Sequence, residues 1–269
     1  MLNNIKIATK DTFVYSLGNI TTKIIGLILL PLYTDELSVA EYGVLGTVEI
    51  TIQVLIATFS FSLQQALSRW YWDKRYKDKQ KSIFFTTLIA ISFGILLMLL
   101  IFLPFSKILS LSLLDSIAYS YLFKLLLISA ASQIISRLVL IVMRLKRKPL
   151  LFSLSNVFKL LITLGLTIYF IVKLDRGVEG IIEAQIIGFV CLLAVNLKFV
   201  IRNIHPVFER FILKDMLRFS YPLAISAVGG VLLTVTDKYA VRYMSGMEKM
   251  GLYNLGFKLA NVLKVFVIN

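Results

Sequence analysis

The chain has 269 residues, of which 58% are hydrophobic and 16% are charged, and its formal net charge is +14. Apolar stretches long enough to cross about 30 Å of hydrocarbon recur along it, so the composition excludes an ordinary soluble domain with a polar surface. A single cysteine, Cys191, excludes a disulfide framework and a cysteine-based metal site. We therefore expect an integral membrane protein without a metal or a cofactor.

The apolar stretches predict an all-α, polytopic membrane protein. Each span needs about 20 residues as a helix, because every backbone polar group must be satisfied within lipid. In chain order we predict eight transmembrane helices, covering residues 13–34, 44–67, 82–104, 119–143, 150–172, 181–201, 219–243 and 251–269.

Lysine and arginine gather in alternate connections between these spans. The N-terminal segment and the connections after the second, fourth and sixth spans hold 16 of them, whereas the other connections hold four. This bias predicts a cytoplasmic N-terminus. Topology and anionic lipid headgroups therefore account for the basic excess, and we expect membrane lipids rather than nucleic acid as its partner.

Lysines within the predicted spans are the first candidates for a functional site. Lys23 lies ten residues past the start of its span, about 15 Å deep at a rise of 1.5 Å per residue, and Lys159 has a similar depth. Such a lysine is unfavourable unless it meets water, a partner or an anionic ligand, so we interpret both as facing a hydrated cavity. Arg137 and Arg242 lie nearer the ends of their spans, where we expect them to reach the interface.

Polar side chains recur at helical spacing in five of the spans. They are Asn19 and Lys23 in the first, Glu49, Gln53, Ser60 and Gln64 in the second, Ser129, Gln133 and Arg137 in the fourth, Asn156 and Lys159 in the fifth, and Ser226, Gly230, Thr234 and Asp237 in the seventh. The uncharged members fit hydrogen bonds between helices as well as the lining of a cavity. Glu49 is a candidate ion-pair partner for one of the deep lysines. Asp237, with Lys238 and Arg242, fits an interfacial ion-pair cluster as well as a ligand site.

A weak internal repeat predicts two lobes. Residues 13–17 are similar to 219–223 and residues 43–55 to 251–263, and both copies begin on the same side of the membrane, six spans apart. We therefore expect a six-helix N-terminal lobe over residues 1–210 and the first two helices of a parallel second lobe over 211–269. The chain is then expected to be an N-terminal fragment of a longer protein.

Four stretches of the chain carry a resemblance to a known family, and they are "IIGLILLPLYTDELSVAEYGVLGTVE", "ALSRWYWD", "RLKRKP" and "FSYPLAISAVGGVLLTVTDKYAVRYMSGMEKMGLYNLGFKLANVL". They resemble bacterial polysaccharide flippases, which export O-antigen or capsule repeat units and belong to the multidrug/oligosaccharidyl-lipid/polysaccharide exporter superfamily. The resemblance implies two lobes around a cleft that opens alternately to each side of the bacterial cytoplasmic (inner) membrane. It also implies an undecaprenyl-diphosphate-linked oligosaccharide as substrate, and a glycan polymerase and other assembly proteins as candidate partners.

The resemblance assigns the charged residues a role in holding the diphosphate. Lys23 is the leading candidate, Lys159 is the second, and the third is the group of Asp237, Lys238 and Lys258. Two alternatives stay open. A cation-coupled multidrug exporter of the same fold fits Glu49 but not the deep lysines, and a membrane glycan polymerase or ligase would be expected to present a large external loop. We see no nucleophile, paired catalytic carboxylates or phosphate loop in the sequence and expect no enzymatic activity.

Overall fold

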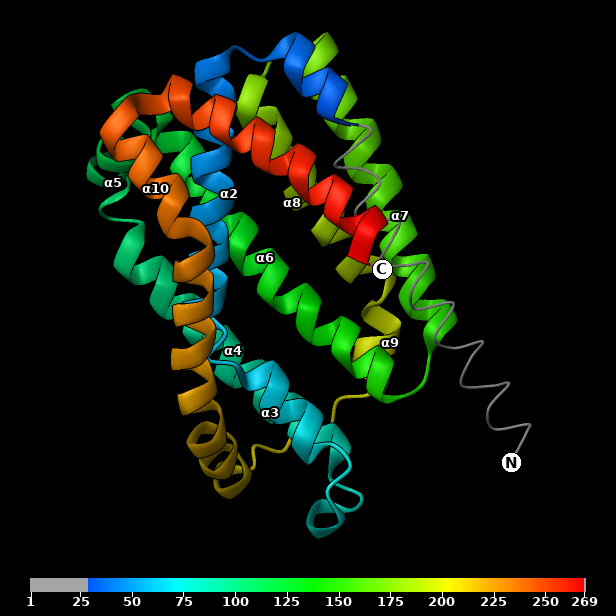
Figure 1. Ribbon diagram of the computed structural model, residues 1–269. Helices are drawn as coiled ribbons and strands as arrows, with labels where there is room; N and C mark the ends of the chain where they lie inside the picture. Colours follow the sequence, from blue (N-terminus) through cyan, green and yellow to red (C-terminus); the bar gives the residue numbers. More distant parts are fainter. Residues whose placement is uncertain (1–28, 269) are drawn as a thin grey trace.

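The computed structural model describes residues 29–268, with side chains described up to residue 260, and every regular element in that part is helical (Figure 1). Residues 29–36 are helical and lead into the long helices. The helices that follow are α2 (Val39–Phe59), α3 (Leu63–Trp70), α4 (Gln80–Phe102), α5 (Ser106–Leu114), α6 (Ser120–Leu145), α7 (Pro149–Ile168), α8 (Gly177–Val195), α9 (Leu197–Arg202) and α10 (Arg210–Ile268). Short helical turns at Lys74–Tyr76 and Ile117–Tyr119 and a π-helical turn at Tyr169–Lys173 connect some of them.

The second predicted span is not one continuous helix. Phe61 and Ser62 have φ values of 49° and 50°, in the left-handed region that interrupts a right-handed helix. The chain therefore ends α2 at Phe59 and starts α3 at Leu63, in place of the single helix expected over residues 44–67. The sixth predicted span is divided in a similar way, into α8 and the short α9.

The last two predicted spans are the two arms of α10. Gly246 interrupts the helix with φ 83° and ψ 178°, so we call residues 210–245 the first arm and residues 247–268 the second arm. In the described part, six helices are long and apolar enough to cross a membrane, with α10 counted once. Most of the first predicted span, 13–34, lies outside the described residues.

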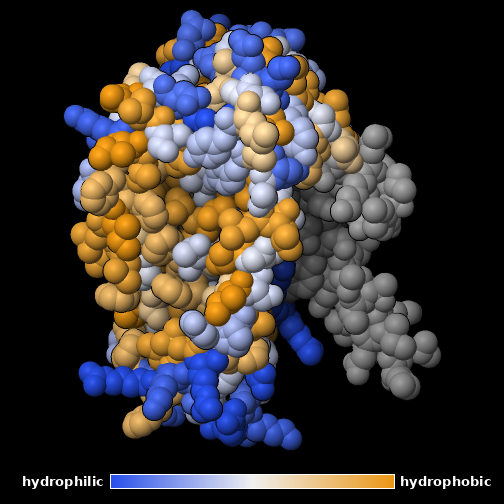
Figure 2. Space-filling model, turned by 60° about the vertical axis from the view of Figure 1, so that its left-hand side comes forward, coloured by the Kyte–Doolittle hydropathy of each residue, from blue (hydrophilic) through white to orange (hydrophobic). Residues whose placement is uncertain are grey.

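The connections divide between two ends of the bundle. Residues 71–79, 146–148 and 203–209 lie at the lower end in Figure 1, and the α5 region and the Gly246 turn lie at the upper end. Figure 2 shows a hydrophobic belt between two hydrophilic ends. The three connections at the lower end belong to the lysine- and arginine-rich set, so the structure places these basic segments together, as the alternating pattern requires.

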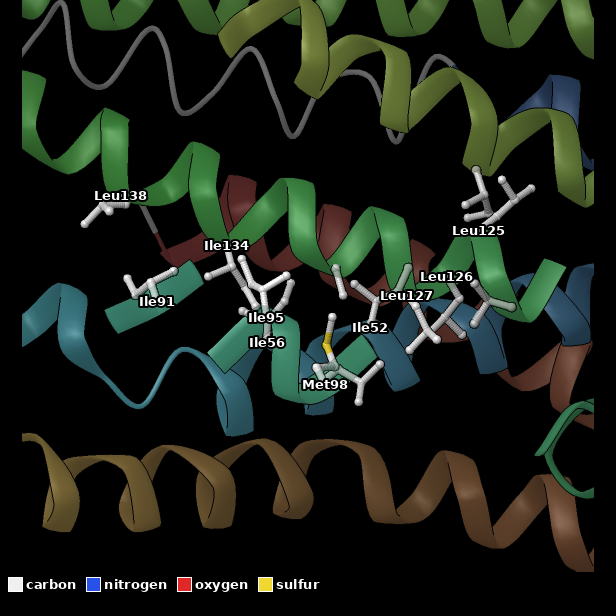
Figure 3. Packing of buried hydrophobic residues seen from close by; sticks show 14 of the residues in the cluster. Ile52, Ile56, Ile91, Ile95, Met98, Leu125, Leu126, Leu127, Ile134 and Leu138 are labelled. Atoms are coloured by element: carbon white, nitrogen blue, oxygen red, sulfur yellow. The ribbon is translucent and has the colours of Figure 1, made fainter. Parts of the chain in front are cut away.

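The core lies between α2, α4, α6 and α8. Figure 3 shows its centre, where Ile52 and Ile56 of α2 pack with Ile95 and Met98 of α4 and with Leu127 of α6. This packing buries the face of α2 that carries its isoleucines. The polar residues Glu49 and Gln53 lie at a different angle around α2, so they face neighbours of the helix other than this apolar core.

Helices α2 and α10 meet with their backbones in contact. A Cβ atom placed on Gly43 would lie 2.0 Å from the carbonyl oxygen of Met247, and one on Gly251 would lie 2.2 Å from the carbonyl oxygen of Val39. Only glycine allows two helices to approach so closely at these positions. The contact joins the start of α2 to the turn of α10 at the upper end of the bundle in Figure 1.

Candidate functional site

A cavity of about 480 Å³ lies within the bundle, between α2, α3, α6, α8 and the first arm of α10. Its apolar lining comes from Ile52, Ile56, Ala57, Ala227 and Val231. The other nine lining residues are polar or charged, and they are Glu49, Gln53, Ser60, Ser62, Gln64, Gln65, Gln133, Arg137 and Gln185. A space with this lining inside a membrane-spanning bundle is suited to water and to a hydrophilic ligand.

The lining follows from helical spacing and from the break after α2. Glu49, Gln53 and Ser60 fall on one face of α2 because they are four and seven residues apart. The left-handed turn at residues 61–62 then directs α3 so that Gln64 and Gln65 face the same space. The break, which the sequence interpretation did not include, therefore extends the polar stripe of α2 into the cavity wall.

Several polar groups of the cavity lack a partner. Within the described part of the chain, the side chains of Arg137, Gln53, Gln65 and Gln185 make no hydrogen bond or ion pair with the protein. Polar groups in a membrane-spanning bundle are unfavourable unless water, protein or a ligand satisfies them. These four side chains are therefore available to water or to a bound molecule.

Arg137 is a cavity residue that the sequence analysis placed near the end of its span. We expected its side chain to reach the membrane interface, and the structure adds that it lines the cavity. Arg137 follows Gln133 by four residues on α6, so the polar stripe in the sequence contained the signal for its position. It lies eight residues before Leu145, the end of α6 that leads into a basic connection. The cavity thus holds a guanidinium on the side of the bundle where the basic connections gather.

Glu49 forms an ion pair with Lys258. The Lys258 Nζ lies 2.9 Å from the Glu49 Oε1, and both side chains are partly exposed, with 25% and 30% of their areas accessible. The same ammonium lies 5.2 Å from the ring centre of Tyr42 and 5.8 Å from that of Tyr33. We expected Glu49 to pair with one of the deep lysines, Lys23 or Lys159, but its partner is Lys258 of the second arm of α10, and Lys23 lies outside the described residues.

Two further candidates on the first arm of α10 lie apart from the cavity lining. Lys238 is buried, donates a 3.3 Å hydrogen bond to Asn254 and lies 3.9 Å from the ring centre of Phe257. Asp237 is exposed and accepts a hydrogen bond from Tyr253. Lys238 therefore joins the two arms of α10, and Asp237 does so at their surface.

The candidates on α7 and Arg242 contact other parts of the protein. Lys159 lies 4.5 Å from the ring centre of Phe189, and buried Asn156 donates a 2.9 Å hydrogen bond to the Phe152 carbonyl of its own helix. Neither residue is part of the cavity lining. Arg242 is buried, donates to carbonyl oxygens at the end of α5 and forms a 2.6 Å ion pair with Asp115. Its expected position at the membrane interface stays a prediction. Lys23 and Asn19 lie outside the described residues.

Comparisons with known proteins give the family and the fold. A family model described as polysaccharide biosynthesis protein matches residues 8–269. A multidrug resistance MATE family transporter of the MOP superfamily, solved in an inward-facing conformation, is 19% identical and has a TM-score of 0.67 over 93% of this chain and 59% of that chain. An outward-facing structure with the same family description is 18% identical and has a TM-score of 0.74 over 98% and 61% of the two chains. No curated protein matches the sequence.

The chain thus spans about 60% of the length of the two solved transporters. At these identities the likeness shows the fold alone, which is similar to that of the two solved transporters. The family model covers nearly the entire sequence, including the helices that form the cavity. The chain therefore belongs to the polysaccharide biosynthesis protein family and is a membrane protein with a transporter fold.

Proposed function

We propose that this chain forms the substrate cavity of a flippase that moves polyprenyl-diphosphate-linked oligosaccharides across the bacterial cytoplasmic membrane by alternating access. The observation that carries the proposal is the polar cavity inside the bundle, with a guanidinium on Arg137 that has no partner among the described residues. The family description supports a glycan as cargo, and the transporter fold supports movement across the membrane. The division into a lobe over residues 1–210 and the start of another over 211–269 remains part of this proposal.

Arg137 would provide the contact for the diphosphate. A planar guanidinium binds phosphate oxygens through two parallel hydrogen bonds, and such charge-assisted bonds are stronger than neutral ones. The position of Arg137 toward the basic end of α6 suits a headgroup that enters from that side while its lipid tail stays in the bilayer. Lys23 remains a candidate for a second contact.

The charge balance of the cavity favours an anionic headgroup over a cationic drug. The carboxylate of Glu49 is neutralised by Lys258, so Arg137 is the lining residue whose charge has no partner in the described part. The lining that residues 29–260 contribute holds no aromatic side chain, whereas sites for drug-sized molecules are mostly hydrophobic and aromatic. A cation-coupled multidrug exporter is therefore the weaker candidate.

The proposal is tested by complementation with the full-length protein in a bacterium that lacks its own flippase and has the matching glycan pathway. We expect Arg137→Ala to reduce surface polysaccharide about 10- to 100-fold, because a hydrogen bond to a charged group contributes roughly 1.5–3 kcal/mol. Arg137→Lys should restore part of the export. Arg202→Ala, which removes an exposed arginine of α9, is the matched control and should leave export unchanged.

The amount of each variant in the membrane is measured in the same cells, so that loss of export is separated from loss of protein. Full export by Arg137→Ala at normal abundance would show that the diphosphate does not depend on this guanidinium. Equal loss in Arg137→Ala and Arg202→Ala would show a general effect of positive charge, and would also contradict the assignment of Arg137.

A further inference from the structure

We infer that the glutamine side chains of the cavity bind the hydroxyl groups of the glycan, so that the sugar is recognised by neutral hydrogen bonds. This inference rests on the proposed function and specifies which part of the substrate the cavity holds. Five glutamines line the cavity, on four of the helices that surround it, and they are Gln53 on α2, Gln64 and Gln65 on α3, Gln133 on α6 and Gln185 on α8.

The free hydrogen-bonding capacity of these amides is large. The side-chain amides of Gln53, Gln65 and Gln185 make no hydrogen bond within the described part of the chain. Each primary amide offers two donors and a carbonyl oxygen that accepts. If these glutamines only joined neighbouring helices, their amides would be engaged with those helices. Gln53 and Gln65 are exposed and Gln185 is half-buried, so the three amides can reach a ligand with hydroxyl groups in several directions from separate walls of one cavity.

The other two glutamines are held in place by the protein. Gln64 donates a 3.3 Å hydrogen bond from its Nε2 to the carbonyl of Ile134, and Gln133 donates a 3.2 Å bond to the Ser129 Oγ. These bonds engage the amide nitrogens and leave the carbonyl oxygens as acceptors. The cavity thus combines two oriented acceptors with three amides that can both donate and accept.

This chemistry matches a neutral sugar. A sugar hydroxyl donates one hydrogen bond and accepts others, which is the capacity that an amide complements. An acidic sugar would be matched better by cationic side chains, and within the described lining the cation without a partner is Arg137. We therefore assign the amides to uncharged, polyhydroxylated sugar units and the guanidinium to the diphosphate.

The spacing along α6 agrees with the connectivity of such a substrate. Gln133 precedes Arg137 by four residues, which corresponds to about 6 Å along the helix. In a lipid-linked oligosaccharide the first sugar is bonded directly to the diphosphate. A diphosphate held at Arg137 therefore places the first sugar beside Gln133, and the following sugars extend toward Gln53 and Glu49 on α2.

The test compares two probes on the purified full-length protein in detergent. One probe is a short-chain polyprenyl diphosphate carrying a neutral disaccharide, and the other is the same lipid diphosphate without sugar. We expect the double variant Gln53→Leu/Gln185→Leu to bind the glycosylated probe at least about tenfold more weakly, because two neutral hydrogen-bonding groups are lost. Its affinity for the sugar-free probe should equal that of the wild type, which also shows that it is folded.

Two controls complete the design. Gln80→Leu changes a glutamine at the start of α4, outside the cavity lining, and should bind both probes as the wild type does. Arg137→Ala should weaken binding of both probes, because both carry the diphosphate. The glutamine pair and the arginine thereby separate recognition of the sugar from recognition of the phosphate.

The outcomes distinguish the two proposals. If the glutamine variant binds both probes as tightly as the wild type, or loses both equally, the assignment of the amides to sugar hydroxyls is overturned and the flippase proposal is unaffected. If the wild type binds neither probe, the proposed function is overturned together with this inference. Selective loss of the glycosylated probe supports both.

Discussion

The replacement Gly251→Ala tests the backbone contact between α2 and α10. The Cβ atom that alanine adds would lie 2.2 Å from the carbonyl oxygen of Val39 and 3.1 Å from the amide nitrogen of Gly43. Both neighbours are backbone atoms, so no side-chain rotation can relieve the overlap. Ordinary contact begins at 3.4 Å, and the two helices must therefore separate by roughly 1.2 Å.

The size of the effect follows from the cost of overpacking, which is about 1–3 kcal/mol for an extra methyl group in a tightly packed site. Because 1.4 kcal/mol changes an equilibrium constant tenfold, we expect the close arrangement of α2 and α10 to lose about 5- to 150-fold in population relative to arrangements in which they are apart. The same strain should lower the thermal stability of the purified protein.

Cross-linking measures the arrangement directly. The Thr47 Oγ1 lies 3.8 Å from the Met247 Sδ across the contact, so these side chains face each other and the pair Thr47→Cys/Met247→Cys should react with a short bifunctional thiol reagent when Cys191 is replaced by serine. Adding Gly251→Ala should lower the rate of cross-linking at least about fivefold, in line with the smallest expected strain. Thermal unfolding of the same proteins in detergent gives an independent value.

The matched control is Gly256→Ala, which lies on the same arm of α10. No atom lies within 4 Å of the Cβ built there, so alanine should be accommodated and should favour the helix by up to about 1 kcal/mol. If Gly251→Ala and Gly256→Ala cross-link at the same rate and unfold at the same temperature, the close backbone contact does not hold α2 against α10.

Three further predictions concern single contacts. Glu49→Gln and Lys258→Met should show a coupling of about 0.5–3 kcal/mol in a double-mutant cycle of thermal unfolding, and a value near zero would mean that their 2.9 Å ion pair does not join α2 to α10. Arg242→Met leaves carbonyl oxygens at the end of α5 without their donor and should lower the free energy of unfolding by about 1–3 kcal/mol; unchanged stability would contradict this role. Hydrogen bonds from Arg75 lower the pKa of Asp73 from 3.8 to about 2, so the contribution of this contact to stability is present above pH 3.8 and is lost as the pH falls through 2. In Arg75→Gln the carboxyl titration, followed by NMR, should move back toward 3.8, and an unmoved midpoint would exclude Arg75 as the cause.

The helices themselves could be predicted because their signal is local. An apolar run of about 20 residues predicts a spanning helix wherever it occurs, since lipid offers no partner to an unsatisfied backbone. The spans predicted over 82–104 and 119–143 correspond to α4 and α6, with ends shifted by one or two residues. The alternation of basic connections is a local signal as well. It predicts that the basic segments share one side of the membrane, and the structure has the described ones at one end of the bundle.

The candidate site could be predicted only in part, because polar spacing along one helix gives a face but not its neighbour. Glu49 and Gln53 were identified from their stripe and do line the cavity. Asn156 lay on a similar stripe, yet its amide is satisfied by its own helix. Both kinds of stripe look the same in sequence, since the hydrogen-bond partner of an amide is not encoded in its spacing.

The sequence by itself determined that the chain is a bundle of membrane helices with buried polar faces. The tertiary structure decided which polar groups meet: Lys258, 209 residues away, neutralises Glu49, and Arg137 remains without a partner in the described part. The tertiary structure also contains the left-handed break at Phe61, which directs α3 so that it forms part of the cavity wall. These features depend on distances between segments far apart in the chain, and the packing of α2 against α6 and α10 sets those distances.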